Sequence, residues 1–182
     1  MKSPWLALVQ FFPLSIFALY AFWHGAPSDE RWLAAFQIGA LLALIQLIWV
    51  LRQAQPANRL ILAANLYLIA GGMAAFFQQW WFLKLYGSLR VAAIFVFILA
   101  VGIVTTLCSP AGFIAQAAAP TQQVRTASYY LLAATLIALT VSLYYRGNQT
   151  WAAVVPIVSL VILQRILARR VIHAHNNESE GD

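Results

Sequence analysis

The sequence predicts an all-α, polytopic membrane protein, a bundle of about six transmembrane helices joined by short loops. Of the 182 residues, 63% are hydrophobic and 9% are charged, against about 45–50% and about 25% in soluble domains. A water-soluble fold of this length cannot hide that much apolar surface, so much of it must face lipid. The apolar residues also form runs of the length, about 20 residues, that a helix needs to cross the membrane. These runs lack the alternation of barrel strands, so helices are the structure they favour.

The first expected span covers residues 5–23 and carries no charge. Because it follows Met1-Lys2, a cleaved signal peptide is an alternative, but the run exceeds the roughly 7–15 apolar residues of a signal core. Cleavage there would also place Pro27 directly after the cut. We therefore expect this span to remain in the mature protein, with a kink where Pro13 removes a backbone donor.

Five further spans are expected at residues 32–51, 60–77, 91–108, 127–145 and 151–168. Their apolar runs contain no formal charge, and the last run ends near Gln164, from which a helix can continue into the interface. Pro156 predicts a second kink. Residues 1–172 then form one six-helix transmembrane domain, and residues 173–182 form a flexible, polar, cytoplasmic tail.

The distribution of Lys and Arg predicts the orientation, because positive residues concentrate on the cytoplasmic side. With the N-terminus inside, seven cations fall on the inner side and four on the outer side. The inner ones are Lys2, Arg52, Arg59, Arg125, Arg165, Arg169 and Arg170, and the outer ones are Arg31, Lys84, Arg90 and Arg146. We therefore expect both termini in the cytoplasm.

Small and neutral polar residues indicate how the helices pack. Small residues allow backbones to approach closely, and the set expected at helix contacts is Ala35, Gly39, Ala43, Ala70, Gly71 and Ala74. Neutral polar side chains in the spans are expected to bond between helices at about 0.6 kcal/mol each. They are Gln10, Gln37, Gln46, Asn65, Thr105, Thr106, Thr135, Thr140, Ser142 and Ser159. A pathway for an uncharged or lipidic substrate stays open as the alternative.

Two loops are expected to lie at the membrane interface. The loop after the third span is rich in aromatic residues around Gln78-Gln79, and it is expected to lie at the headgroup level of the outer face. The residues expected to make interfacial contacts there are Phe76, Phe77, Trp80, Trp81 and Lys84. The cytoplasmic segment 109–125 holds Pro110 and Pro120 around an Ala-rich piece, which predicts a short interfacial helix.

The chain lacks the groups that intramembrane enzymes and ion-coupled carriers use. All five acids lie outside the spans, which excludes paired carboxylates at membrane depth: Asp29, Glu30, Glu178, Glu180 and Asp182. The sequence contains no Gly-rich phosphate loop, nucleophile elbow or HExxH motif. We therefore expect neither an enzyme nor a cofactor. The cations stand singly between apolar runs, which argues against nucleic acid as a partner.

Metal binding is the other chemistry to weigh. His24 shares a loop with Asp29 and Glu30, but Ser28 followed by these acids is more typical of a helix N-cap. His173 and His175 are two isolated histidines in the expected tail. Cys108, the single cysteine, permits no intrachain disulfide and is expected to serve packing. No metal site is therefore predicted.

The order of several short motifs resembles the bacterial intracellular septation protein A family. The motifs are Phe11-Phe12-Pro13-Leu14, Gly71-Gly72 followed by Phe76-Phe77, then Phe82-Leu83-Lys84, and Trp151 after a polar loop. Gln78-Gln79 and the residues after Arg125 depart from the family pattern, so the chain resembles a divergent member. The resemblance implies a non-enzymatic protein of the bacterial inner membrane. It also implies support of envelope maintenance and cell division through contacts with division or peptidoglycan-elongation membrane proteins.

Two other functions remain open. A substrate-binding membrane subunit of a modular importer also uses about six helices, and the absence of charge in the spans restricts it to a neutral or lipidic ligand. An integral-membrane lipid-modifying enzyme would need catalytic groups that the sequence does not show. The oligomeric state is open, a homo-oligomer included.

Overall fold

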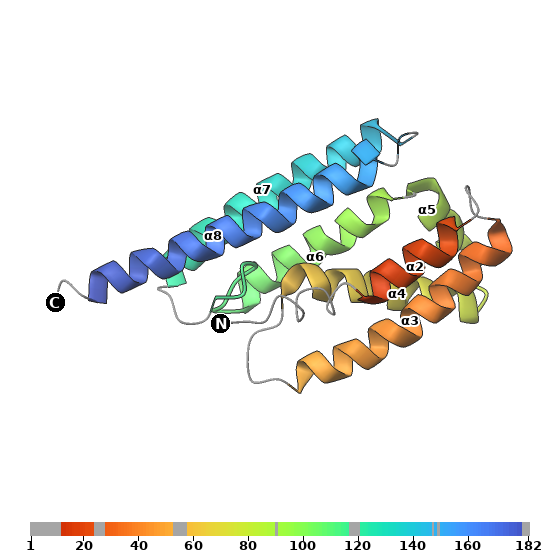
Figure 1. Ribbon diagram of the computed structural model, residues 1–182, viewed down its shortest axis with the longest axis horizontal. Coiled ribbons are helices and arrows are strands. Elements are labelled where there is room, and N and C mark those ends of the chain that lie inside the picture. The colour runs from red at the N-terminus through yellow and green to blue at the C-terminus, as the bar shows by residue number, and fades with distance from the viewer. Residues whose placement is uncertain are drawn as a thin grey trace. The chain divides into compact units, whose positions relative to one another are not determined.

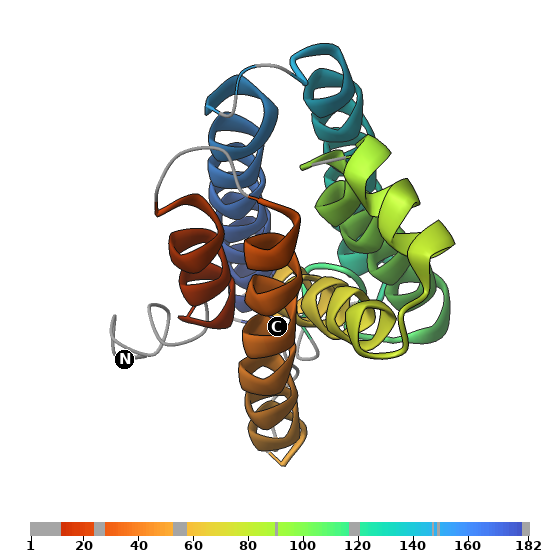
Figure 2. The ribbon, with the colours of Figure 1, turned by 90° about the vertical axis from the view of Figure 1, so that its right-hand side faces the viewer.

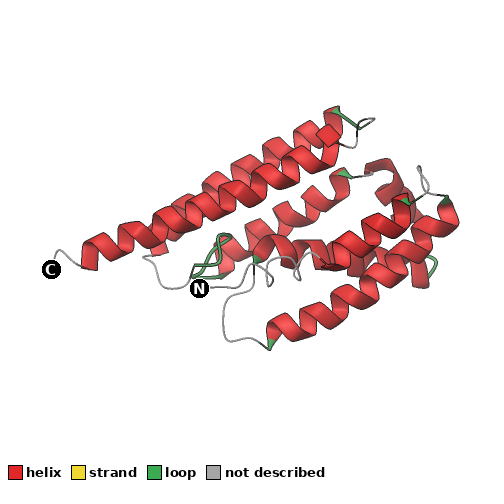
Figure 3. Cartoon of the chain, in the orientation of Figure 1, coloured by secondary structure: helices red, strands yellow, loops and turns green. Residues whose placement is uncertain are grey.

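The computed structural model describes residues 12–23, 28–52, 58–89, 91–116, 121–146, 148 and 150–179, and over these residues the chain is helix and loop, without strands (Figure 3). The predicted all-α class is therefore confirmed. The elements are α2 (Phe12–Phe22), α3 (Asp29–Leu51), α4 (Arg59–Phe76), α5 (Trp80–Leu89), α6 (Ala92–Cys108), α7 (Thr121–Tyr144), the π-helical turn η1 (Thr150–Val154) and α8 (Val155–Ser179) (Figure 1).

Four segments are long and apolar enough to cross a membrane: Glu30–Leu51, Arg59–Phe76, Thr121–Tyr144 and Thr150–Ile172. The number rises to five if α5 and α6 form one broken span, so the predicted six is not confirmed. Helix α6 has 17 residues, or about 26 Å of axis against about 30 Å of hydrocarbon. Helix α2 has 11 residues. Residues 1–11, with the start of the expected first span, lie outside the described residues, so the kink at Pro13 stays a prediction.

The chain divides into two compact units. The first unit comprises Met1–Ala54 and Ile61–Ser88, and the second comprises Gln55–Leu60 and Leu89–Asp182. The first therefore contains α2, α3, α5 and most of α4. The second contains α6, α7, η1 and α8, together with the residues that precede and begin α4.

The first unit is built around aromatic rings. Helices α2 and α3 pack against each other (Figure 2). Phe17 of α2 lies 4.7 Å from Phe36 of α3, measured between ring centroids, and Phe36 lies 5.7 Å from Tyr67 of α4. Phe36 is fully buried. These large rings fill the space between helices that small residues alone would leave empty.

The second unit is a row of antiparallel helices in which α7 packs against both α6 and α8 (Figures 1 and 2). The buried residues of α7 recur every three or four positions, as expected for one face of a helix: Val124, Ala127, Ser128, Leu131, Thr135, Ala138 and Ser142. Pro156 is the second residue of α8, and the π-turn η1 precedes it within one helical segment, Thr150–Ile172. Pro156 has no N–H to donate to the turn before it, and the kink predicted there stays a prediction.

Two segments differ from the sequence predictions. The short helix was expected within residues 109–125, but residues 109–116 form turns and residues 121–125 begin α7; residues 117–120 lie outside the described residues. The reason is local: Gly112 and Ala115 adopt left-handed conformations with φ of 57° and 59°, which end any right-handed helix. In the C-terminal part of the chain, α8 continues to Ser179, past residue 168 and into the expected tail, because no Gly or Pro stands between Pro156 and Gly181 to end it. Residues 180–182 lie outside the described residues.

Candidate functional site

The aromatic residues predicted to contact the membrane interface are exposed. Phe76 is 72% exposed and Trp81 is 67% exposed. Phe77, Trp80 and Lys84 are exposed as well. We call residues 76–84 the aromatic segment. It presents four large rings and one cation on the surface of the first unit.

A helix cap shapes this segment. The N–H of Gln79 donates to the carbonyl of Ala74 at 2.9 Å, and that of Gln78 donates to the carbonyl of Ala75 at 3.4 Å. Gln78 has a φ of 52°. This bonding pattern with a left-handed residue is a Schellman motif, which ends α4 and satisfies its last carbonyls. The chain therefore leaves α4 at Gln78, and α5 begins at Trp80.

Tyr86 ties α5 to the core of the first unit. Its ring is 3% exposed and stacks on the ring of Tyr67 at 5.2 Å with an angle of 7°. Its hydroxyl donates to the Tyr67 carbonyl at 3.3 Å. Phe82 lies on the same side of α5, 4.9 Å from Tyr86. One face of α5 is thus held by rings, while Trp80, Trp81 and Lys84 remain exposed.

The helix-packing residues lie mostly where small side chains are needed. Ala35, Gly39, Ala43, Gly71 and Ala74 are buried, whereas Ala70 is partly exposed. A Cβ at Gly39 would lie 3.2 Å from the Cβ of Phe17. Gly72, not predicted as a packing residue, makes the closest approach: a Cβ there would overlap the Cβ of Ala40 and lie 2.8 Å from the carbonyl oxygen of Phe36.

The neutral polar residues behave in two ways. Asn65 of α4 donates to the side-chain oxygen of Gln46 of α3 at 2.8 Å, and both are buried, so this pair bonds between helices as expected. Thr106 and Thr135 instead donate to carbonyls of their own helices, those of Gly102 and Leu131. Residues that bond within one helix do not hold two helices together.

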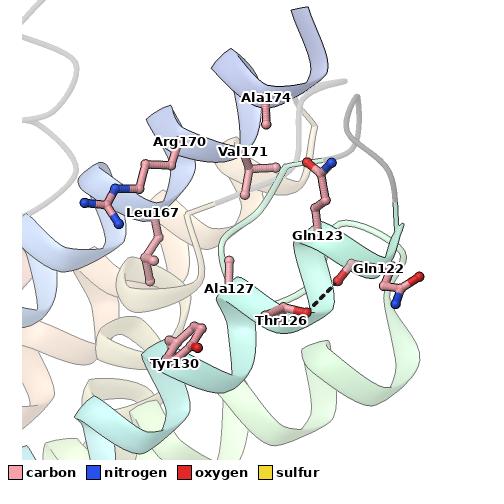
Figure 4. A pocket seen from close by; sticks show the side chains of 9 residues that line it. All are labelled: Gln122, Gln123, Thr126, Ala127, Tyr130, Leu167, Arg170, Val171 and Ala174. Carbon is pink, nitrogen blue, oxygen red and sulfur yellow. Dashed lines mark hydrogen bonds between the residues drawn. The ribbon is translucent and has the colours of Figure 1, made fainter. Parts of the chain in front are cut away.

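The structure also shows a groove that the sequence did not predict. It has a volume of about 630 Å³ and lies between the start of α7 and the later turns of α8, within the second unit (Figure 4). Its lining residues are Gln122, Gln123, Thr126, Ala127, Tyr130, Leu167, Arg170, Val171 and Ala174. One feature of the sequence could have predicted it. Gln122-Gln123 precede one apolar run and Arg169-Arg170 follow another, and two antiparallel helices bring these polar pairs to the same end.

The groove has polar rims and an apolar floor. Ala127 and Val171 are buried, whereas Arg170 and Gln122 are exposed. In Figure 4 the Arg170 guanidinium lies at the opposite end of the view from the amides of Gln122 and Gln123, with Leu167 and Ala127 between them. The Thr126 hydroxyl donates to the main-chain carbonyl of Gln122 at 3.0 Å. The side-chain amide of Gln122 takes no part in that bond.

Residues considered for other chemistry take other roles or lie outside the described residues. Ser28 caps α3, and its hydroxyl accepts from the N–H of Arg31 at 3.4 Å, which confirms the predicted N-cap. Cys108 is exposed as the last residue of α6, so the prediction that it serves packing was wrong. Among the described side chains, no group of three His, Cys, Asp or Glu residues is placed to hold a metal ion. The side chains of His24, Asp29, His173 and His175 lie outside that set.

Comparisons with known protein families, with characterised proteins and with solved structures find no match to this chain. The resemblance to the septation protein family therefore stays a prediction from the short motifs in the sequence.

Proposed function

We propose that this chain is a non-enzymatic membrane protein that supports cell-envelope maintenance or cell division through protein or lipid contacts. The observation that carries the proposal is the aromatic segment, whose rings are exposed while the helix beneath them is tied to the core. Trp and Tyr rings and Lys side chains favour the headgroup region because each has an apolar part and a polar end. Such a segment suits contact and not catalysis.

Rigidity supports a recognition role for the segment. The Schellman cap fixes the backbone at Gln78, and the stacked Tyr67–Tyr86 pair holds α5. The Trp81 indole N–H also donates to the Gln79 side chain at 3.1 Å. Side chains that are already ordered lose less entropy on binding, so an ordered aromatic patch binds a partner better than a flexible one.

The resemblance provides the cellular setting of the proposal. It implies the bacterial inner membrane and partners from division or peptidoglycan elongation. In the predicted six-span layout, in which a first span crosses before α3 and both termini are cytoplasmic, the aromatic segment would face outward, toward the side on which the envelope is built. The four or five apolar helices that could span a membrane are compatible with this multi-pass setting.

The experiment replaces Trp80, Trp81 and Lys84 together with serine in cells that lack the native gene. The matched control replaces Tyr144, Tyr145 and Arg146, which are also two adjacent exposed aromatic residues and a cation. We expect the first variant to lose normal septation and cell shape and the control to keep both. The measurements are cell length, septum spacing and the amount of protein in the membrane.

Normal septation in the Trp80/Trp81/Lys84 variant, at native amounts in the membrane, would refute the proposal. The same deletion strain separates it from the transport alternative. A permease subunit for a neutral or lipidic ligand predicts normal septation after deletion and loss of uptake of one solute.

A further inference from the structure

The second unit carries cations at the groove end of α7 and α8 that no described acid offsets. Arg170 lines the groove, and Arg169 is next to it in sequence on α8. Arg125 lies on α7 between the lining residues Gln123 and Thr126. The acids of this unit all lie at residues 178–182, outside the described side chains. The described side chains around the groove therefore include three arginines and no carboxylate.

If α7 and α8 cross a membrane, the groove falls at the depth of the lipid headgroups. Both of its helices contain segments long and apolar enough to cross a membrane. Helix α7 has 24 residues, or about 36 Å, which exceeds the hydrocarbon thickness of about 30 Å. Its first polar turns, with Gln122 and Gln123, therefore extend into the headgroup layer. Arg169 and Arg170 follow the apolar part of α8, which ends near Gln164, and lie close to the first turns of α7.

We propose that this groove binds one anionic phospholipid. The Arg170 guanidinium would bind the phosphate, and the Gln122 and Gln123 amides would bond the glycerol and headgroup oxygens. Leu167, Val171 and Ala127 would contact the first part of an acyl chain. Basic pockets between transmembrane helices are known sites for anionic headgroups.

The separation of the polar groups favours a lipid over a free anion. Arg170 lies at one end of the groove in Figure 4 and the two glutamines lie at the other, with an apolar floor between them. A compact ion would leave that floor bare, whereas an extended amphiphile covers both rims and the floor. The volume of about 630 Å³ falls within the roughly 300–1,000 Å³ of typical ligand pockets. The proposal goes beyond the function proposed above and uses the other unit, so either can fail without the other.

The experiment measures lipid binding to the purified full chain in a neutral detergent. Native mass spectrometry follows titrations with phosphatidylglycerol, with phosphatidylcholine and with glycerol 3-phosphate. The variants Arg170→Gln and Gln122→Leu alter exposed groove residues, and Arg146→Gln, at the other end of α7, is the charge-matched control. The melting temperature of each variant without lipid shows whether it is folded.

We expect phosphatidylglycerol to bind about tenfold more tightly than phosphatidylcholine, and Arg170→Gln to lose about tenfold in affinity, as for one charge-assisted hydrogen bond. Gln122→Leu should lose less, and Arg146→Gln should match the native chain. Equal binding of both lipids, equal effects of Arg170→Gln and Arg146→Gln, or glycerol 3-phosphate binding as tightly as the lipid would each overturn the proposal. A second copy of the chain occupying the groove in place of lipid would also overturn it.

Discussion

The two units solve the same packing problem with different side chains. In lipid, the hydrophobic effect does not drive helices together, so close packing and hydrogen bonds must do so. The first unit uses rings: Phe17, Phe36, Tyr67 and Tyr86 contact one another across its helices. The second unit also buries two rings, Phe95 and Phe113, but most of the buried face of α7 consists of small and hydroxyl-bearing residues.

The two units therefore differ in the kind of substitution that should destabilise them most. In the first, Gly71 and Gly72 bring α4 so close to Phe36 and Ala40 that even a methyl group would overlap. In the second, the Ser128 hydroxyl accepts from the N–H of Phe113 at 2.9 Å and holds the turn before α7. Added volume at Gly72 and loss of the Ser128 hydrogen bond are therefore the changes expected to matter most in the first and second units, although a Cβ at Gly102 of the second unit would also lie 2.8 Å from the Leu132 and Phe113 side chains.

The largest effect is expected for Gly72→Val. The added side chain would strike the Cβ of Ala40 and the backbone of Phe36, which should destabilise the protein by about 3 kcal/mol through overpacking. Gly87→Ala is the control, because a Cβ there meets nothing within 4 Å. Helix propensity should make it more stable by about 0.5–1 kcal/mol. Unfolding in mixed micelles with increasing dodecyl sulfate measures the stability of both variants. Equal effects of Gly72→Val and Gly87→Ala would contradict the claim that lack of space at Gly72 causes the loss.

The second prediction concerns two serines of one helix. Ser128→Ala removes the acceptor of the buried Phe113 N–H, at a cost of about 1–3 kcal/mol for an unsatisfied donor. Ser142 is 1% exposed, and its hydroxyl has no hydrogen-bond partner among the described residues. Ser142→Ala should therefore be neutral or slightly stabilising. The same unfolding assay compares them, and a larger loss for Ser142→Ala would contradict the role given to the Ser128 bond.

The sequence predicted the parts of this structure that depend on composition and on the spacing of residues along one helix. The all-α class followed from the apolar excess, and Ala35, Gly39 and Ala43 share a helix face because they are four residues apart. The exposure of Trp80 and Trp81 followed from the preference of aromatic residues for interfaces. Each of these rests on residues near one another in the chain.

The remaining features depend on contacts between distant residues, which spacing does not reveal. The groove forms because the first turns of α7 meet the later turns of α8, about 45 residues apart in the chain. Thr106 and Thr135 were expected to bond between helices, but hydroxyls in helices readily donate to the carbonyl four residues earlier. The left-handed conformation of Ala115 is rare for a residue with a Cβ, so the turns at 109–116 had no sequence signal at that position.

The smallest effect tests whether the first unit depends on hydrogen bonds at all. A double-mutant cycle with Gln46→Leu and Asn65→Leu measures the coupling of this buried pair, expected at about 0.6 kcal/mol. Gln37→Leu with Asn65→Leu is the control cycle, because Gln37 is exposed on the same helix, and its coupling should be zero within error. A coupling above about 1.7 kcal/mol, the highest measured for such bonds in a membrane, would show that this hydrogen bond, like the aromatic contacts, is a main source of stability in the first unit. The contrast between the two units would then be one of degree, since both would hold their helices with polar pairs.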